Sequence, residues 1–190
     1  MPWLIAGLAL FLGVHSLAIV APAARERWAA QLGGGRWQLL YGFIALSGFV
    51  LLVYGYGLAR HDPVVLYTPP AWTRELALLL MLPVFPLLLA AYLPGRIQST
   101  LKHPLLAATK AWALAHLVAI GTLAAVILFG SVLAWAVADR VSLKRRVPRA
   151  IRTIPAGRWN DWIAVLGGLA LYGLFVTALH VRLIGVSPLG

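Results

Sequence analysis

Two histidines, His15 and His116, lie inside long apolar stretches of the sequence. An ionisable side chain in such surroundings is costly unless it is paired, hydrogen-bonded or bound to a metal. Neutral imidazole is the commonest metal ligand, it holds haem iron in many proteins, and it also shuttles protons. The structural alternative is a ring that hydrogen-bonds a nearby backbone carbonyl. One isolated histidine favours that alternative, whereas two at comparable depth favour a ligand role.

The depth of each histidine follows from the helical rise of about 1.5 Å per residue. His15 is about 9 Å from the end of the first apolar segment, and His116 is roughly 17 Å from Leu105, where its own segment begins. In the six-helix arrangement predicted below, both of these ends lie on the cytoplasmic side. Two imidazoles on opposite faces of one haem bridge this difference of about 8 Å if the helices tilt. The depths of His15 and His116 are therefore compatible with ligation of one shared haem. His180, near the far end of the last segment, is a poorer partner by depth, although a shorter or tilted helix brings it closer.

A second group of candidates precedes the helix that holds His116. His103 stands before Pro104, which suits the first turn of a helix. One interpretation makes His103 a residue of the helix start in the membrane interface. The other has it bind an anionic group together with Lys102 and Arg96. The residues alone leave both open.

Other reaction chemistries lack their residues. The sequence contains no cysteine, so it has no disulfide, thiol nucleophile or Cys-ligated metal. It also lacks a phosphate-binding glycine loop, a serine elbow and an HExxH motif. An intramembrane carboxylate relay is absent, because all five carboxylates fall in loops or at segment ends: Glu26, Asp62, Glu75, Asp139 and Asp161.

The elements that position the histidines are membrane helices. Of the 190 residues, 62% are hydrophobic and 11% charged, against about 45–50% and about 25% in soluble domains. We predict an all-α, multi-pass membrane bundle and a single domain over residues 1–190, with spans at 3–20, 37–58, 75–93 and 159–183. Pro83 and Pro86 are expected to kink the third.

The segment 105–138 is about 51 Å long as one helix, which is too long for one upright span. Either one helix leaves the bilayer, or two short helices form a hairpin that turns near residues 120–122. With a hairpin, thirteen Lys and Arg residues lie on one side and three on the other; without it the split is nine to seven. Because cytoplasmic loops are rich in Lys and Arg, we predict six membrane helices and two periplasmic termini.

The net charge of +11 raises the question of a polyanion partner. Basic residues beside membrane spans are the usual topology signal, so we predict no nucleic-acid partner. The cytoplasmic loop 139–158 holds the densest basic run, Lys144-Arg145-Arg146, and residues 140–158 are expected to contact anionic headgroups of the bilayer.

Several segments together resemble the NnrU family over nearly the full length. They include the first-span histidine, the start of the second span and the residues before and around the second histidine. They read Phe11-Leu-Gly-Val-His15-Ser16, Arg36-Trp-Gln-Leu-Leu-Tyr41, Pro94-Gly95-Arg96-Ile97, Leu101-Lys-His103-Pro104, Trp112-Ala-Leu-Ala-His116-Leu117, Leu128-Phe129-Gly130-Ser131, Trp135-Ala136-Val137 and Gly185-Val-Ser-Pro188.

This resemblance implies a bacterial cytoplasmic-membrane protein linked to nitrogen-oxide metabolism, related to plant zeta-carotene isomerase, a membrane enzyme thought to use haem b. Carried over, it makes His15 and His116 the axial ligands of haem b and leaves room for a lipophilic polyene substrate. Where the family has an Asn-Gly-Asp-like turn, this chain has Ile120-Gly121-Thr122.

Two other functions remain as alternatives. The chain would act as a cofactor-free scaffold or carrier for a partner complex if the altered turn reflects a lost site. A fainter similarity links its His-Pro before a hairpin to isoprenylcysteine methyltransferases. Those enzymes use acidic residues after the hairpin, where this chain has Asp139-Arg140 and a basic run, which argues against methyl transfer.

Overall fold

The computed structural model describes residues 1–146 and 153–190. These residues are helical apart from loops and one isolated β-bridge, which confirms the all-α prediction. The chain divides into two compact units. The first unit comprises residues 1–68 and 121–145, and the second comprises residues 69–120 and 146–190.

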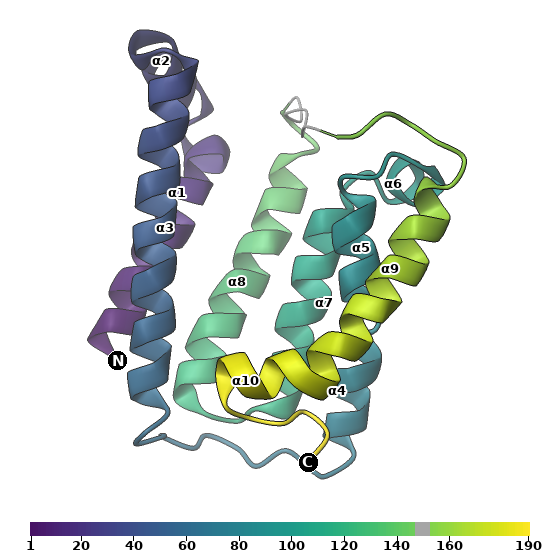
Figure 1. Cartoon of the computed structure of the whole chain (residues 1–190). Helices are drawn as coiled ribbons and strands as arrows, with labels where there is room; N and C mark the ends of the chain where they lie inside the picture. Colours follow the sequence, from purple (N-terminus) through teal and green to yellow (C-terminus); the bar gives the residue numbers. More distant parts are fainter. Residues whose placement is uncertain (147–152) are drawn as a thin grey trace. The chain divides into compact units, whose positions relative to one another are not determined.

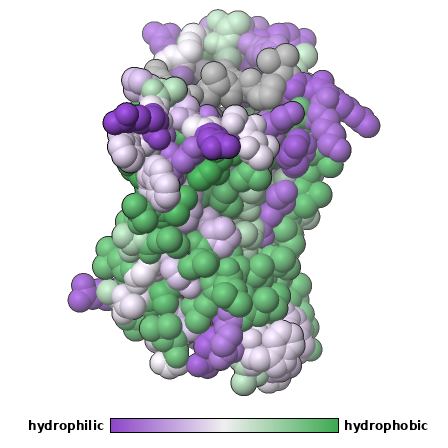
Figure 2. Space-filling view, turned by 90° about the vertical axis from the view of Figure 1, so that its right-hand side faces the viewer, coloured by the Kyte–Doolittle hydropathy of each residue, from purple (hydrophilic) through white to green (hydrophobic). Residues whose placement is uncertain are grey.

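Among the described residues, five helical stretches are long and apolar enough to cross a membrane: Pro2–Val20, Gly34–Ala59, Thr73–Ala90, Leu123–Ser142 and Asn160–Ile184. A sixth apolar helix, Pro104–Ala119, has 16 residues. Large apolar side chains face outward; Leu39 is 75% exposed and Phe43 70%. Figure 2 shows hydrophobic residues over much of one face, with hydrophilic ones gathered toward its upper end. Such a surface suits lipid contact, as predicted for a multi-pass membrane protein.

The first unit consists of α1 (Pro2–Val20), α2 (Pro22–Leu32), α3 (Gly34–Ala59) and α8 (Leu123–Ser142). Helices α1 and α3 lie side by side (Figure 1), and α8 contacts both. Glycines allow the close approach: a Cβ at Gly7 or Gly55 would overlap the backbone of Leu52 or Leu4. These partner numbers run in opposite directions, so the two helices are antiparallel. Small residues are the usual means of close helix packing in membranes.

The turn at residues 120–122, which departs from the family pattern, is held by hydrogen bonds to a remote segment. The segment after α3 pairs with it through an antiparallel bridge between Val65 and Thr122, and the N–H of Leu66 donates to the Gly121 carbonyl at 2.8 Å. A Cβ at Gly121 would overlap the Tyr67 carbonyl. The Thr122 hydroxyl accepts from the Ala125 N–H at 3.3 Å and caps α8, as threonine commonly does. The turn thus has its glycine and its capping oxygen.

The second unit consists of α4 (Thr73–Met81), α5 (Val84–Ala90), α6 (Arg96–Leu101), α7 (Pro104–Ala119), α9 (Asn160–Leu174), the π-helix η1 (Phe175–Leu179) and α10 (His180–Ile184). Helix α5 packs on α7 and α9 (Figure 1), and α4 packs on α7. A Cβ at Gly168 of α9 would overlap the Pro86 backbone in α5. The Tyr172 hydroxyl donates to the Leu78 carbonyl at 3.0 Å, beside the break between α4 and α5.

The break falls at Leu82 and Pro83, so the predicted proline kink is confirmed. The segment 105–138 also divides where predicted, since α7 ends at Ala119 and α8 begins at Leu123. Two short helices, α2 and α6, were not expected. Of the basic block, residues 147–152 lie outside the described residues.

Candidate functional site

His15 lies in α1, five residues before the helix ends, within an aromatic cluster of the first unit. Its Nδ1 is 2.6 Å from the Phe11 carbonyl oxygen one turn earlier. The ring is 4.4 Å from the Phe11 ring, 5.5 Å from Tyr41 of α3 and 5.8 Å from Trp135 of α8, centroid to centroid. The last two contacts are edge-on, which the ring quadrupoles favour. Three helices thereby fix the imidazole.

Trp135 adds a polar group to this cluster. Its indole Nε1 is buried and has no hydrogen-bond acceptor within the described chain. A buried N–H without an acceptor costs about 1–3 kcal/mol, so buried indoles usually find a partner. The indole meets the His15 ring at 86°. The cluster therefore offers a donor to a polar group of a bound molecule.

His116 lies in α7 of the second unit. Its Nδ1 is 2.8 Å from the Trp112 carbonyl oxygen, and the two rings are 5.1 Å apart between centroids. Ala113 and Ala115 on either side of this turn are fully buried, so neighbouring helices approach α7 closely.

His180 follows the π-helix η1, which interrupts the last span between α9 and α10. A π-turn holds an extra residue and shifts every later side chain around the helix axis, and such turns are frequent at functional sites. The Nδ1 of His180 is 2.6 Å from the Val186 carbonyl oxygen, which ties the C-terminal segment back onto the helix. Its ring meets Phe175 edge-on at 5.7 Å.

The three histidines share one hydrogen-bonding pattern. In each neutral ring Nδ1 must carry the proton, because a carbonyl oxygen can only accept. The lone pair is therefore on Nε2. Histidines that bind metals typically donate their other N–H to a backbone carbonyl or carboxylate, which orients the ring. The structural alternative, a ring that hydrogen-bonds a backbone carbonyl, is thus observed in all three, while the role of Nε2 as a metal ligand stays a prediction.

Within the described ranges, no group of three or more histidine, aspartate or glutamate side chains is arranged to hold a metal ion. A metal held by protein side chains alone normally needs such a group. Axial ligation of a macrocycle needs only one or two imidazoles.

A family model described as NnrU protein matches residues 3–188. This chain belongs to the NnrU family. The match covers both units and all the segments on which the resemblance was based. No curated protein and no solved structure matches the chain.

One of the segments that resemble the NnrU family, Pro94-Gly95-Arg96-Ile97, is held in place by the carboxylate of Asp161. No role for this carboxylate was predicted from the sequence. The Asp161 carboxylate accepts the backbone N–H of Arg96 at 2.8 Å and that of Ile97 at 3.1 Å. A Cβ at Gly95 would overlap this carboxylate. Asp161 therefore caps α6 from the first turn of α9. The signals for this cap in the sequence were the Pro-Gly pair before Arg96 and an acidic residue at the start of the last span.

Asn160 completes this latch between α6 and α9 in the NnrU-family chain. Its buried amide donates to the Pro94 carbonyl at 2.9 Å and to the Pro155 carbonyl at 3.2 Å. Both bonds satisfy carbonyls that no helix uses. The latch fixes the start of the last span, and with it the register of the helix that leads to His180.

Arg96, Lys102 and His103 do lie close in sequence to the start of α7, as the anion-binding interpretation requires. Arg96 begins α6, Lys102 directly follows its last residue, and His103 precedes α7. Lys102 has φ of 61°, and the His103 N–H donates to the Leu101 carbonyl at 2.7 Å across it. This γ-turn is a strained one. An anionic ligand at these residues stays a prediction.

Proposed function

We propose that this NnrU-family chain is a membrane protein that binds haem b through intramembrane histidines. The observation that supports the proposal is the shared pattern in which Nδ1 donates to a carbonyl and Nε2 keeps its lone pair. Aromatic rings surround His15 in the first unit, and buried alanines flank His116 in the second, so each imidazole lies in apolar surroundings.

His116 would hold the iron on one side. The second ligand would be His15, as the family resemblance implies, or His180, which belongs to the same unit as His116. The indole N–H of Trp135, buried beside His15, would donate to a polar substituent of a bound group. Bound haem b would supply an iron for redox chemistry with nitrogen oxides or for isomerisation of a lipid-soluble polyene. The chain's own residues orient the ligands and exclude water from them.

The competing function, a cofactor-free scaffold or carrier, rested on the altered turn at residues 120–122. Gly121 and Thr122 provide the close approach and the helix cap there. The altered turn thus has a structural account that needs no loss of a site, so this argument for the scaffold weakens.

The haem proposal is tested by reduced-minus-oxidised absorption spectra of the purified full chain, expressed with an adequate haem supply. We expect a b-type spectrum for the unmodified protein. His116→Ala should abolish it or convert it to a five-coordinate form, and only one of His15→Ala and His180→Ala should do the same. His61→Ala, in an exposed loop, is the control. A featureless spectrum of the unmodified protein would rule the proposal out in favour of the scaffold.

We further propose that the chain resides in a bacterial cytoplasmic membrane with its basic loop 139–158 in the cytoplasm and both termini in the periplasm. The distribution of thirteen basic residues against three supports this orientation. Residues 140–158 would then contact anionic headgroups of the inner leaflet.

A further inference from the structure

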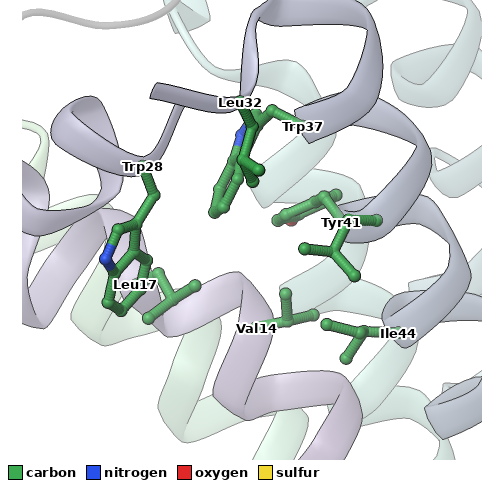
Figure 3. Close-up of a pocket in the computed structure, with 8 residues that line it drawn as sticks. Val14, Leu17, Trp28, Leu32, Trp37, Tyr41 and Ile44 are labelled. Carbon is green, nitrogen blue, oxygen red and sulfur yellow. The ribbon is translucent and has the colours of Figure 1, made fainter. Parts of the chain in front are cut away.

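A cavity of about 210 Å³ lies within the first unit where α1, α2 and α3 meet, and its wall residue Tyr41 also contacts the His15 ring. Figure 3 shows its side chains around an opening, with Trp28 on one side and Tyr41 and Ile44 on the other. Its walls are almost entirely apolar: Val14, Leu17, Trp28, Leu32, Trp37, Leu40, Tyr41 and Ile44. A ligand here must itself be apolar where it enters, because the walls offer few polar partners.

The size of the cavity limits what it holds. Pockets for drug-sized ligands are about 300–1,000 Å³, so 210 Å³ is too small for a porphyrin. It suits a narrow, flexible hydrocarbon, such as part of one acyl chain. Burial of each methylene contributes about the same free energy, so a partly inserted chain still binds.

A cation stands at the edge of this cavity. Arg25, Trp28 and Leu32 share one face of α2, because they are spaced at i, i+3 and i+7. The last two line the cavity. The Arg25 guanidinium also lies 5.8 Å from the ring centroid of Trp37, another wall residue. Arginine binds phosphate through a fork of N–H donors, so a phosphate at Arg25 would have its hydrocarbon beside the cavity.

The position of α2 fits the membrane interface. It begins at Pro22, directly after the first span ends at Val20, and it has no buried residue. Tryptophan and arginine on such a helix lie at the level of the lipid headgroups. We propose that this cavity binds one acyl chain of an anionic phospholipid whose phosphate is held by Arg25.

The test is native mass spectrometry of the purified full chain with equal amounts of dioleoyl phosphatidylglycerol and dioleoyl phosphatidylethanolamine. The unmodified protein should retain one phosphatidylglycerol in preference. Arg25→Gln should reduce that preference roughly tenfold, as expected for a lost charge-assisted contact. Arg25→Lys should retain most of it. Arg27→Gln, an exposed residue off this face of the same helix, should have no effect.

Filling the cavity tests the binding of the acyl chain separately from the binding of the lipid headgroup. Ile44→Trp should remove the bound lipid while the thermal midpoint stays that of a folded protein; Ile44→Phe replaces it if the tryptophan variant does not fold. Equal loss from Arg25→Gln and Arg27→Gln, equal retention of both lipids, or an unchanged complex in the filled variant would each overturn the proposal. Displacement by glycerol phosphate, which has no acyl chain, would show an anion site and overturn it too.

Discussion

At the scale of single residues, backbone carbonyls decide how the histidines present themselves. His15 and His116 each donate to the carbonyl four residues earlier, while His180 donates to Val186 six residues later. The first two bonds are available to any histidine inside a helix. The third needs the chain to turn back after α10, which Gly185 allows with φ of 79°. Each ring thus gets a fixed tautomer from local structure.

Lys102 is the described non-glycine residue with a positive φ. Such a backbone costs of order 1–3 kcal/mol in a residue with a Cβ, and glycine avoids most of this while losing about 0.5–1 kcal/mol in entropy. We expect Lys102→Gly to stabilise the protein by about 1 kcal/mol, measured as a raised thermal midpoint in detergent. Lys102→Ala, which removes the side chain without relieving the backbone, should not. Equal shifts in both variants would refute a backbone origin.

Asp161 should contribute more than an ordinary surface carboxylate. It accepts two backbone N–H groups at the start of α6, and hydrogen bonds to charged groups are worth about 1.5–3 kcal/mol. We expect Asp161→Ala to lower the free energy of unfolding by about that amount and to speed amide exchange at Arg96 and Ile97. Asp161→Asn should have a smaller effect. The control is Asp62→Asn in an exposed loop; a loss of equal size there would contradict the cap.

At the scale of elements, glycine positions fix how α1 and α3 pack. Gly55→Ala adds a methyl group that overlaps the Leu4 backbone, and overpacking of this kind costs about 1–3 kcal/mol. Gly42→Ala adds the same group on the same helix, where nothing lies within 4 Å. We expect a lowered thermal midpoint for the first variant only, followed by tryptophan fluorescence. Similar midpoints for the two would mean that the close contact is not formed in the membrane protein.

Sequence reasoning found the spans because hydropathy acts on each segment alone, and it found the break near residues 120–122 from length and charge. It did not find α2, which is short and polar, or the π-helix η1, which has no known sequence pattern. Of the α3 glycines Gly42, Gly48 and Gly55, only the last two make close contacts. Which glycines meet a neighbour depends on the rotation of each helix.

The candidate site, too, was predictable from the sequence only in part. Histidines in apolar segments are visible in a sequence, because an ionisable group there needs a reason. The residues that contact them come from remote segments, as Tyr41 and Trp135 do beside His15. The contact between Asp161 and Gly95 likewise joins distant parts of the sequence. No spacing rule connects such residues, so these contacts could be obtained only from the fold. Local chemistry was predictable, and assembly was not.

At the scale of the whole molecule, the number of membrane crossings depends on whether α7 spans the bilayer. Five helical stretches in the described part of the chain are long enough. Helix α7 has 16 residues, or about 24 Å, against a hydrocarbon core of about 30 Å. Short helices cross when the bilayer thins or flanking residues reach the interface, and Lys102 and His103 precede α7. If α7 and α8 both cross, residues 62 and 144 lie on opposite sides; if they act as one crossing, both lie on the same side.

The absence of native cysteine makes this measurable, since any introduced thiol is the sole target of a maleimide. We expect Asp62→Cys and Ser187→Cys to react with a membrane-impermeant maleimide in intact spheroplasts, and Lys144→Cys to react only after permeabilisation. Reaction of residues 62 and 144 from the same side would reduce the count to five crossings. It would also remove the charge asymmetry of thirteen to three on which the orientation rests, because the basic loop would then follow an odd number of crossings from the first cytoplasmic loop.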